Sequence, residues 1–293
     1  MVRPSERWCM STERLTPTEA FEILGDDVRL DILRALNDAD GPLSFSELRN
    51  RTGVSDSGRF NYHLSRLRNH FLRNTDDGYE LGYHGKRVVE AVLGGAFTDT
   101  ASVEPFSVEG SCYDCDGALE GVYEDERVTI SCTVCAERIL SVEFPPSALR
   151  GRDPETLMAA YDRWSVARVS AAADGICPSC AGVTRRELVE APEDLPFDVL
   201  PAFECTVCTN RSVTSFAALA CRSPSVKSFY ADHGVDLEAR PYWDVEPCVT
   251  GEYTTVSSRN PLAVEVVFPA GDEQLRVSLG DDLTVVQTVR EFV

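Results

Sequence analysis

Eight cysteines arranged as four Cys-x-x-Cys pairs constrain this 293-residue chain more than any other feature of its sequence. Sixteen residues separate the first two pairs and 24 the last two, and the second pair of each unit reads Cys-Thr-Val-Cys, so the arrangement is an internal repeat. A two-residue gap lets both thiolates of one turn face the same ion, and two such turns complete a tetrahedron. The eight residues are Cys112, Cys115, Cys132, Cys135, Cys177, Cys180, Cys205 and Cys208.

Strand-like sequence lies between the pairs, for example at 118–123 and 128–131, and a polar turn separates these two stretches. This layout predicts two zinc ribbons, at residues 108–140 and 174–212. Four thiolates leave no position open for water, so each predicted site is closed and structural, with two zinc ions per chain.

Two other readings of the cysteine pairs stay open. Rubredoxin-type iron uses the same four-thiolate ligand set. Disulfide pairing or redox chemistry is less favoured, because a thioredoxin-like βαβ context is missing. Three further cysteines, Cys9, Cys221 and Cys248, fall outside the pairs, and we interpret them as buried or incidental thiols.

The first hundred residues carry the signals of four helices followed by a hairpin. Capping boxes at 16–19 and 44–47 each predict a helix start. Aspartate or serine at 26–27 and at 56–57 can cap two more helices. The Asp-Asp-Gly turn at 76–78 predicts a β-hairpin. This order of elements is typical of a winged helix.

Two motifs then make a resemblance specific. The run LGDDVRLDIL at 24–33 resembles the "L-G-D-x-x-R-x-x-I-L" opening of ArsR-type winged helices, and NYHLSRL at 61–67 is similar to that family's "S-x-H-L-x-x-L". The longer string at 56–64 resembles winged-helix regulators common in halophilic archaea. The resemblance covers about 15–97 and implies a DNA-binding domain over 15–100. Metal sensing is not implied, because residues 15–97 contain no cysteine.

The helix near residue 60 is the predicted recognition helix. Phe60, Leu64 and Leu67 recur at helical spacing and should face the core. Residues 49–73 hold six arginines against one aspartate, a local charge of +5 that suits contact with phosphate. A solvated face used for protein contact is the alternative, and His63 is interpreted as a packed structural residue. The predicted contacts to double-stranded DNA are Arg59, Asn61, Tyr62, Ser65, Arg66 and Arg73.

The rest of the sequence predicts an α+β composite domain over 101–293. Helical patterns cover 84–97, 154–173 and 213–233, the last interrupted by Pro224. Strands are predicted from 241–293, where three apolar runs form an antiparallel meander. In the resembled family a helix such as 84–97 often pairs two copies into a homodimer; packing on its own domain is the alternative. A disordered tail is predicted for 1–14.

The net charge is −20, and the first hundred residues hold 13 basic and 16 acidic residues, so residues 101–293 carry −17 of it. Lys86 and Lys227 are the only lysines. Such a chain resembles proteins of salt-in halophiles; an ordinary acidic cytosolic protein is the alternative. No apolar run is long enough to span a membrane, and the start lacks the apolar core of a signal peptide, so we expect a cytoplasmic protein.

Together these features predict a sequence-specific transcriptional regulator. The alternative is a basal transcription adaptor whose ribbons contact polymerase or other transcription machinery without reading sequence. The chain has no Gly-rich phosphate loop, no nucleophile elbow and no open metal site, so it is not expected to be an enzyme.

Overall fold

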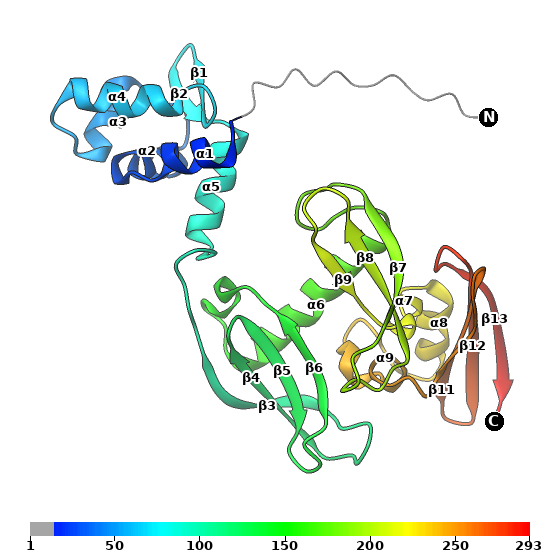
Figure 1. Ribbon diagram of the computed structural model, residues 1–293. Coiled ribbons are helices and arrows are strands. Elements are labelled where there is room, and N and C mark those ends of the chain that lie inside the picture. Colours follow the sequence, from blue (N-terminus) through cyan, green and yellow to red (C-terminus); the bar gives the residue numbers. More distant parts are fainter. Residues whose placement is uncertain (1–14) are drawn as a thin grey trace, which may run out of the picture. The chain divides into compact units, whose positions relative to one another are not determined.

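The computed structural model describes residues 15–293 and falls into two compact units, one ending at Asp99 and the other spanning Thr100–Val293 (Figure 1). The first unit has one hydrophobic core, and the second has two. The tail predicted for 1–14, with Cys9 in it, lies outside the described residues.

Helices and one hairpin make up the first unit. Thr16 and Ser44 form the predicted capping boxes, while Asp26 and Asp56 accept backbone N–H groups at the starts of the other two helices. The fifth helix ends earlier than predicted, because Gly94 follows it at once. The elements are α1 (Pro17–Leu24), α2 (Asp27–Asn37), α3 (Phe45–Thr52), α4 (Ser57–Leu67), β1 (Leu72–Thr75), β2 (Gly78–Leu81) and α5 (Tyr83–Leu93).

The hairpin β1–β2 is antiparallel and is tied to the segment before α3. Leu43 and Tyr79 exchange backbone hydrogen bonds of 3.0 and 2.9 Å. Gly78 beside them has φ +139°, and a Cβ there would lie 2.3 Å from the carbonyl oxygen of Leu43. Only glycine therefore fits this turn, whose close approach holds the hairpin against the helices.

Two antiparallel sheets carry the cysteine pairs in the second unit. The first has the strand order β3-β4-β5-β6 and the second β7-β8-β9, so each is a simple meander. A single turn of 3₁₀ helix, η1 (Pro146–Leu149), follows the first sheet. The strands are β3 (Val103–Ser111), β4 (Ala118–Glu124), β5 (Arg127–Cys132), β6 (Arg138–Glu143), β7 (Thr184–Glu190), β8 (Val199–Cys205) and β9 (Arg211–Val213).

The long helix α6 (Pro154–Ala173), predicted at the same residues, lies between the two ribbon sheets (Figure 1). Leu157 and Tyr161 near its start pack into the core of the first sheet. Ala172 near its end is buried in the other core, with residues of β8 and the C-terminal sheet. The two ends of α6 therefore contribute buried side chains to two different hydrophobic cores. No helix in the described part of the chain combines the length and the apolar character that a membrane crossing requires.

The C-terminal strands form a four-stranded antiparallel meander, so the predicted meander is present with one strand more. The prediction that strands begin at Pro241 is wrong. Pro241 instead precedes one short helical turn, and Pro247 lies inside the next one. Buried Trp243, in the first of these turns, donates from Nε1 to the carbonyl oxygen of Glu109 at 3.0 Å. The elements are η2 (Tyr242–Asp244), α9 (Glu246–Val249), β10 (Thr254–Arg259), β11 (Leu262–Ala270), β12 (Glu273–Leu279) and β13 (Val285–Phe292).

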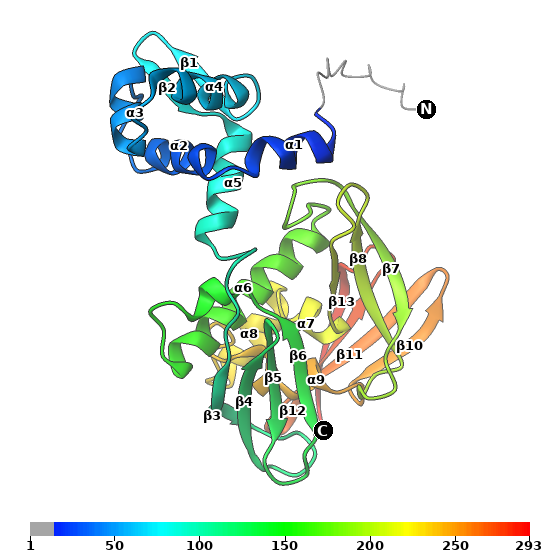
Figure 2. The ribbon, with the colours of Figure 1, turned by 60° about the vertical axis from the view of Figure 1, so that its left-hand side comes forward.

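Two short helices replace the single interrupted segment predicted over 213–233. They are α7 (Phe216–Ala220) and α8 (Pro224–Asp232), and Pro224 stands at the first position of the second one. Both helices share one core with the inner face of the meander, and α7 lies beside it in Figure 2.

Candidate metal centres and nucleic-acid interface

All eight predicted ligands gather into two groups of four. In each group the sulfur atoms lie within 4.8 Å of one another. Sγ–Sγ distances are 3.6 Å for Cys112–Cys135 and 3.5 Å for Cys115–Cys132 in the first group, and the second repeats these values. A tetrahedron with Zn–S near ~2.3 Å has an edge of about 3.8 Å, so the thiols already stand close to a tetrahedral spacing. Each group could hold a metal ion such as zinc.

The backbone builds the same turn four times. The N–H of the first cysteine in each pair donates to the carbonyl five residues later, at 2.8 to 2.9 Å. The residue after each second cysteine adopts a left-handed conformation with φ between +56° and +62°, although none is glycine. These four residues are Asp116, Ala136, Ala181 and Thr209. Four matching turns, two in each cysteine group, indicate that the backbone fixes the spacing of the four sulfur atoms.

Glycine is required where the two turns of a ribbon meet. A Cβ at Gly117 would lie 2.8 Å from Cys132 Sγ, and a Cβ at Gly182 would lie 2.9 Å from a methyl group of Val207. Tyr113 closes the first ribbon from the side, because its hydroxyl donates to Glu137 Oε1 at 2.6 Å. Burial, together with that carboxylate, raises the pKa of Tyr113, so it stays a neutral donor.

Backbone N–H groups favour the thiolate form most strongly at one cysteine of each group, whereas the neighbouring sulfurs and burial raise the pKa of Cys135 and of Cys180 to about 12. Those of Cys135 and Val134 lower the pKa of Cys132 to about 6, and those of Cys208 and Val207 lower the pKa of Cys205 to about 6. The Val134 N–H donates to Cys132 Sγ at 3.3 Å. Since a metal binds the thiolate and not the thiol, these donors suit a ligand site.

The six predicted DNA contacts lie on the surface of the first unit. All are exposed, including Tyr62 at 58%, whereas Phe60 and Leu64 on the opposite face of α4 are fully buried. Three of the six also make contacts within the fold. The ring centre of Tyr62 lies 5.2 Å from that of His63. The Ser65 hydroxyl donates to the carbonyl of Tyr62 at 2.7 Å, and Arg73 lies 3.7 Å from a carboxylate oxygen of Glu80.

The structure adds positioning contacts that the sequence did not reveal. His63 is buried, as a packed residue should be, and its Nδ1 lies 3.2 Å from Asp26 Oδ1 at the start of α2. The guanidinium of Arg68 lies 5.5 Å from the ring centre of Tyr79, which links the end of α4 to the hairpin. Arg51 at the end of α3 is exposed as well, and its only sequence signal was the arginine-rich stretch.

Two family models match the chain. One, described as "Domain of unknown function (DUF7351)", matches residues 109–285, which include both cysteine groups and most of the second unit. The chain belongs to this family. A second model, "Domain of unknown function (DUF7347)", matches residues 17–92, the stretch of α1–α5. No curated protein and no solved structure matches the chain.

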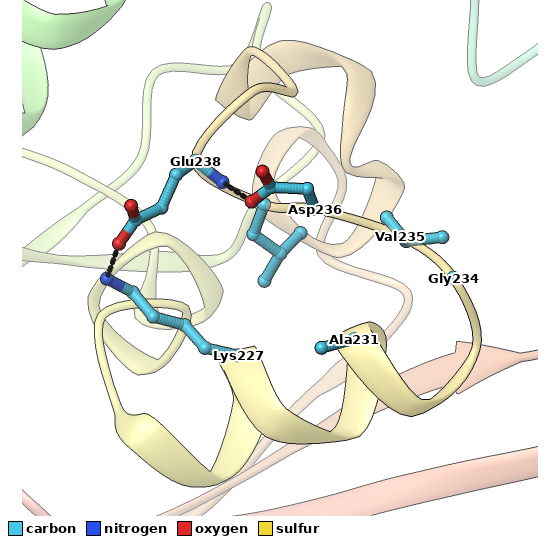
Figure 3. A pocket seen from close by; sticks show the side chains of 7 residues that line it. Lys227, Ala231, Gly234, Val235, Asp236 and Glu238 are labelled. Carbon is cyan, nitrogen blue, oxygen red and sulfur yellow. Dashed lines mark hydrogen bonds and ion pairs between the residues drawn. The ribbon is translucent and has the colours of Figure 1, made fainter.

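The DUF7351 region also contains a small surface pocket of about 300 Å³ at the end of α8 (Figure 3). Lys227 Nζ lies 2.9 Å from Glu238 Oε1, and the N–H of Glu238 donates to Asp236 at 2.9 Å. The charged groups drawn there are thus engaged with one another, and we assign no function to this pocket.

Proposed function

We propose that this protein is a sequence-specific DNA-binding transcriptional regulator. In this proposal α1–α5 form an ArsR-type winged helix, with α4 as the recognition helix and β1–β2 as the wing. The observation that carries it is the division of α4 into two faces. Phe60, Leu64 and Leu67 are fully buried, while the arginines and asparagine between them point away from the core.

The charge of the exposed face of α4 also supports its assignment as the DNA-contacting surface. Arg59 and Arg66 make no ion pair with any residue in the described range 15–293, although the whole chain carries −20. Unpaired arginines in so acidic a protein suit an external polyanion. Arginine and asparagine are also the side chains that best read guanine and adenine edges in the major groove. Phosphate attraction and base reading therefore coincide on one helix.

We further propose that each four-cysteine group holds one structural zinc ion. Four thiolates suit zinc, and they leave no coordination position for substrate or water. The ion would tie the two turns of each ribbon together in place of a larger apolar core. In this reading the ribbons give the second unit its architecture and leave DNA contact to the first.

A second candidate function, an adaptor that contacts transcription proteins through its ribbons, is favoured by one observation. Val134 and Val207, at equivalent positions in the two Cys-Thr-Val-Cys turns, are each 72% exposed. In the adaptor, these two exposed apolar side chains on matching turns would be the contact to a partner protein. If they make it, Val134→Asp and Val207→Asp will abolish co-purification of the transcription machinery, with zinc content and DNA binding unchanged. Co-purification at the wild-type level from both variants would count against the adaptor.

The DNA-binding proposal predicts the behaviour of three substitutions. Arg59→Ala, Asn61→Ala and Arg66→Ala should each weaken specific binding by roughly 1–3 kcal/mol, about five- to 150-fold, because each removes a base-contacting group. Arg34→Ala, which removes an exposed arginine already 3.6 Å from Asp31, is the matched control and should bind normally. Fluorescence anisotropy on a site found by mapping bound genomic DNA, with a scrambled duplex in parallel, measures the change.

Arg73 on the wing gives a different expectation. If it contacts phosphate, Arg73→Ala should weaken binding to the specific and scrambled duplexes by about the same factor. Normal affinity in all three α4 variants would refute the recognition-helix assignment, whatever Arg73 does.

A further inference from the structure

Two cysteines outside the metal centres face each other across the core of the C-terminal region. The sulfur atoms of Cys221 and Cys248 are 3.4 Å apart, although 27 positions separate the residues in the sequence. Cys221 caps the end of α7, and Cys248 lies within α9. Cys248 is buried, as the sequence interpretation of buried or incidental thiols allowed, but that interpretation did not foresee that the two thiols meet.

Backbone contacts hold this arrangement in place. The hydroxyl of Ser215, the residue that caps the start of α7, donates to the carbonyl oxygen of Cys248 at 2.8 Å. The Cys221 N–H donates to Ala217 at 2.8 Å, and the Cys248 N–H donates to Val245 at 2.7 Å. The two cysteines thus lie at or in short helices whose ends are hydrogen-bonded to each other. The fold itself therefore places the two thiols face to face.

The surroundings limit what this pair can do. Within residues 15–293 no third histidine, cysteine or carboxylate completes a metal site with it, since the only two such groups found there are the ribbon cysteines. Cys248 is 5% exposed in an apolar core, while Cys221 is half-buried and so nearer to solvent. Such a pair has one accessible thiol and one protected thiol, which is the arrangement of an attacking and a resolving cysteine.

We propose that Cys221 and Cys248 form a reversible disulfide by exchange with a small-molecule disulfide. The Cys221 thiolate attacks one sulfur of the small disulfide, which breaks its S–S bond, releases one small thiolate and leaves a mixed disulfide on Cys221. The Cys248 thiol gives its proton to the released thiolate. Its sulfur then attacks the Cys221 sulfur of the mixed disulfide and displaces the second small thiolate, which takes up the proton that Cys221 lost. Two protein thiols are oxidised to one disulfide, and one small disulfide is reduced to two thiols.

The bond would close a loop that contains α8 and η2. It would join α7, which follows the second ribbon, to α9, which precedes the meander. Because a cross-link restricts the unfolded chain, the oxidised protein should be the more stable form. The redox state would thereby set the stability of the core shared by α7, α8 and the meander.

The test uses the full chain and oxidised glutathione. After equilibration, free thiols are alkylated under denaturing conditions and the protein is digested with trypsin. Cys221 and Cys248 then lie in separate peptides, 212–222 and 228–259, each with a single cysteine. We expect these two peptides to be joined, with the loss of two hydrogens, and to separate after dithiothreitol. The melting temperature should rise by roughly 5–10 °C on oxidation.

Cys221→Ser is the control, because its half-buried side chain tolerates a hydroxyl better than the buried Cys248 position does. In this variant the linked peptides and the thermal shift should both disappear. The proposal is overturned if the two cysteines of the wild-type protein are recovered as alkylated thiols or as separate glutathione adducts. It is also overturned if the thermal shift persists in Cys221→Ser. Because mass mapping reports each cysteine separately, neither result depends on the metal or DNA assignments.

Discussion

Replacing Cys112 by serine is expected to remove one of the two zinc ions and to unfold the first ribbon. Cys112 is fully buried, and its sulfur stands 3.6 Å from that of Cys135. Binding of a structural zinc ion contributes on the order of 10 kcal/mol to the folding of small ribbons, so a three-thiolate site should lose most of this stabilisation. The second ribbon has its own four ligands and should keep its ion.

Elemental analysis after dialysis against a chelator measures this effect. Wild-type protein should carry two zinc ions per chain, Cys112→Ser one, Cys177→Ser one, and the double variant none. Cys221→Ser makes the same chemical change outside both groups and should retain two. Iron in place of zinc, or two ions retained in Cys112→Ser, would contradict the assignment.

The full chain should become more stable as salt rises from ~0.1 M to ~1 M. Residues 101–293 hold 15 basic and 32 acidic residues, so their carboxylates repel one another at low salt. The Debye length falls from ~10 Å to ~3 Å over this range, which screens most of that repulsion, and we expect a rise in melting temperature of roughly 5–10 °C. Specific DNA binding should fall with salt less steeply than for a basic regulator, because fewer phosphate contacts contribute to it.

Thermal melts of the full chain and of the fragment 1–100 across a salt series test the charge argument. The fragment has a net charge of −3 and its own hydrophobic core, so its melting temperature should change much less. Equal stability of the full chain at both salt concentrations would show that its acidity is not an adaptation to salt.

Local features of this protein could be predicted from its sequence because their physics is local. A capping box needs only residues three apart, and Thr16 and Ser44 start their helices as expected. A Cys-x-x-Cys turn is equally local, and two of them in a ribbon need only a hairpin between them. All eight ligand positions therefore came from spacing alone. The buried stripe of α4, from Phe60 to Leu67, followed from helical periodicity in the same way.

Other features depended on contacts between distant segments. The segment 242–249 was predicted as strand, but it forms the short helical elements η2 and α9. The contact of buried Trp243 with Glu109 of β3 accompanies this conformation. The left-handed residue after each second cysteine carries no glycine signal, because the turn itself imposes the conformation. The contact between His63 and Asp26 and the meeting of Cys221 with Cys248 depend on how helices pack. Sequence spacing determined which cysteines gather into the two groups of four and where helices start. Only the tertiary structure decided which side chains from separate elements face each other, since that depends on how whole elements pack and not on any local pattern.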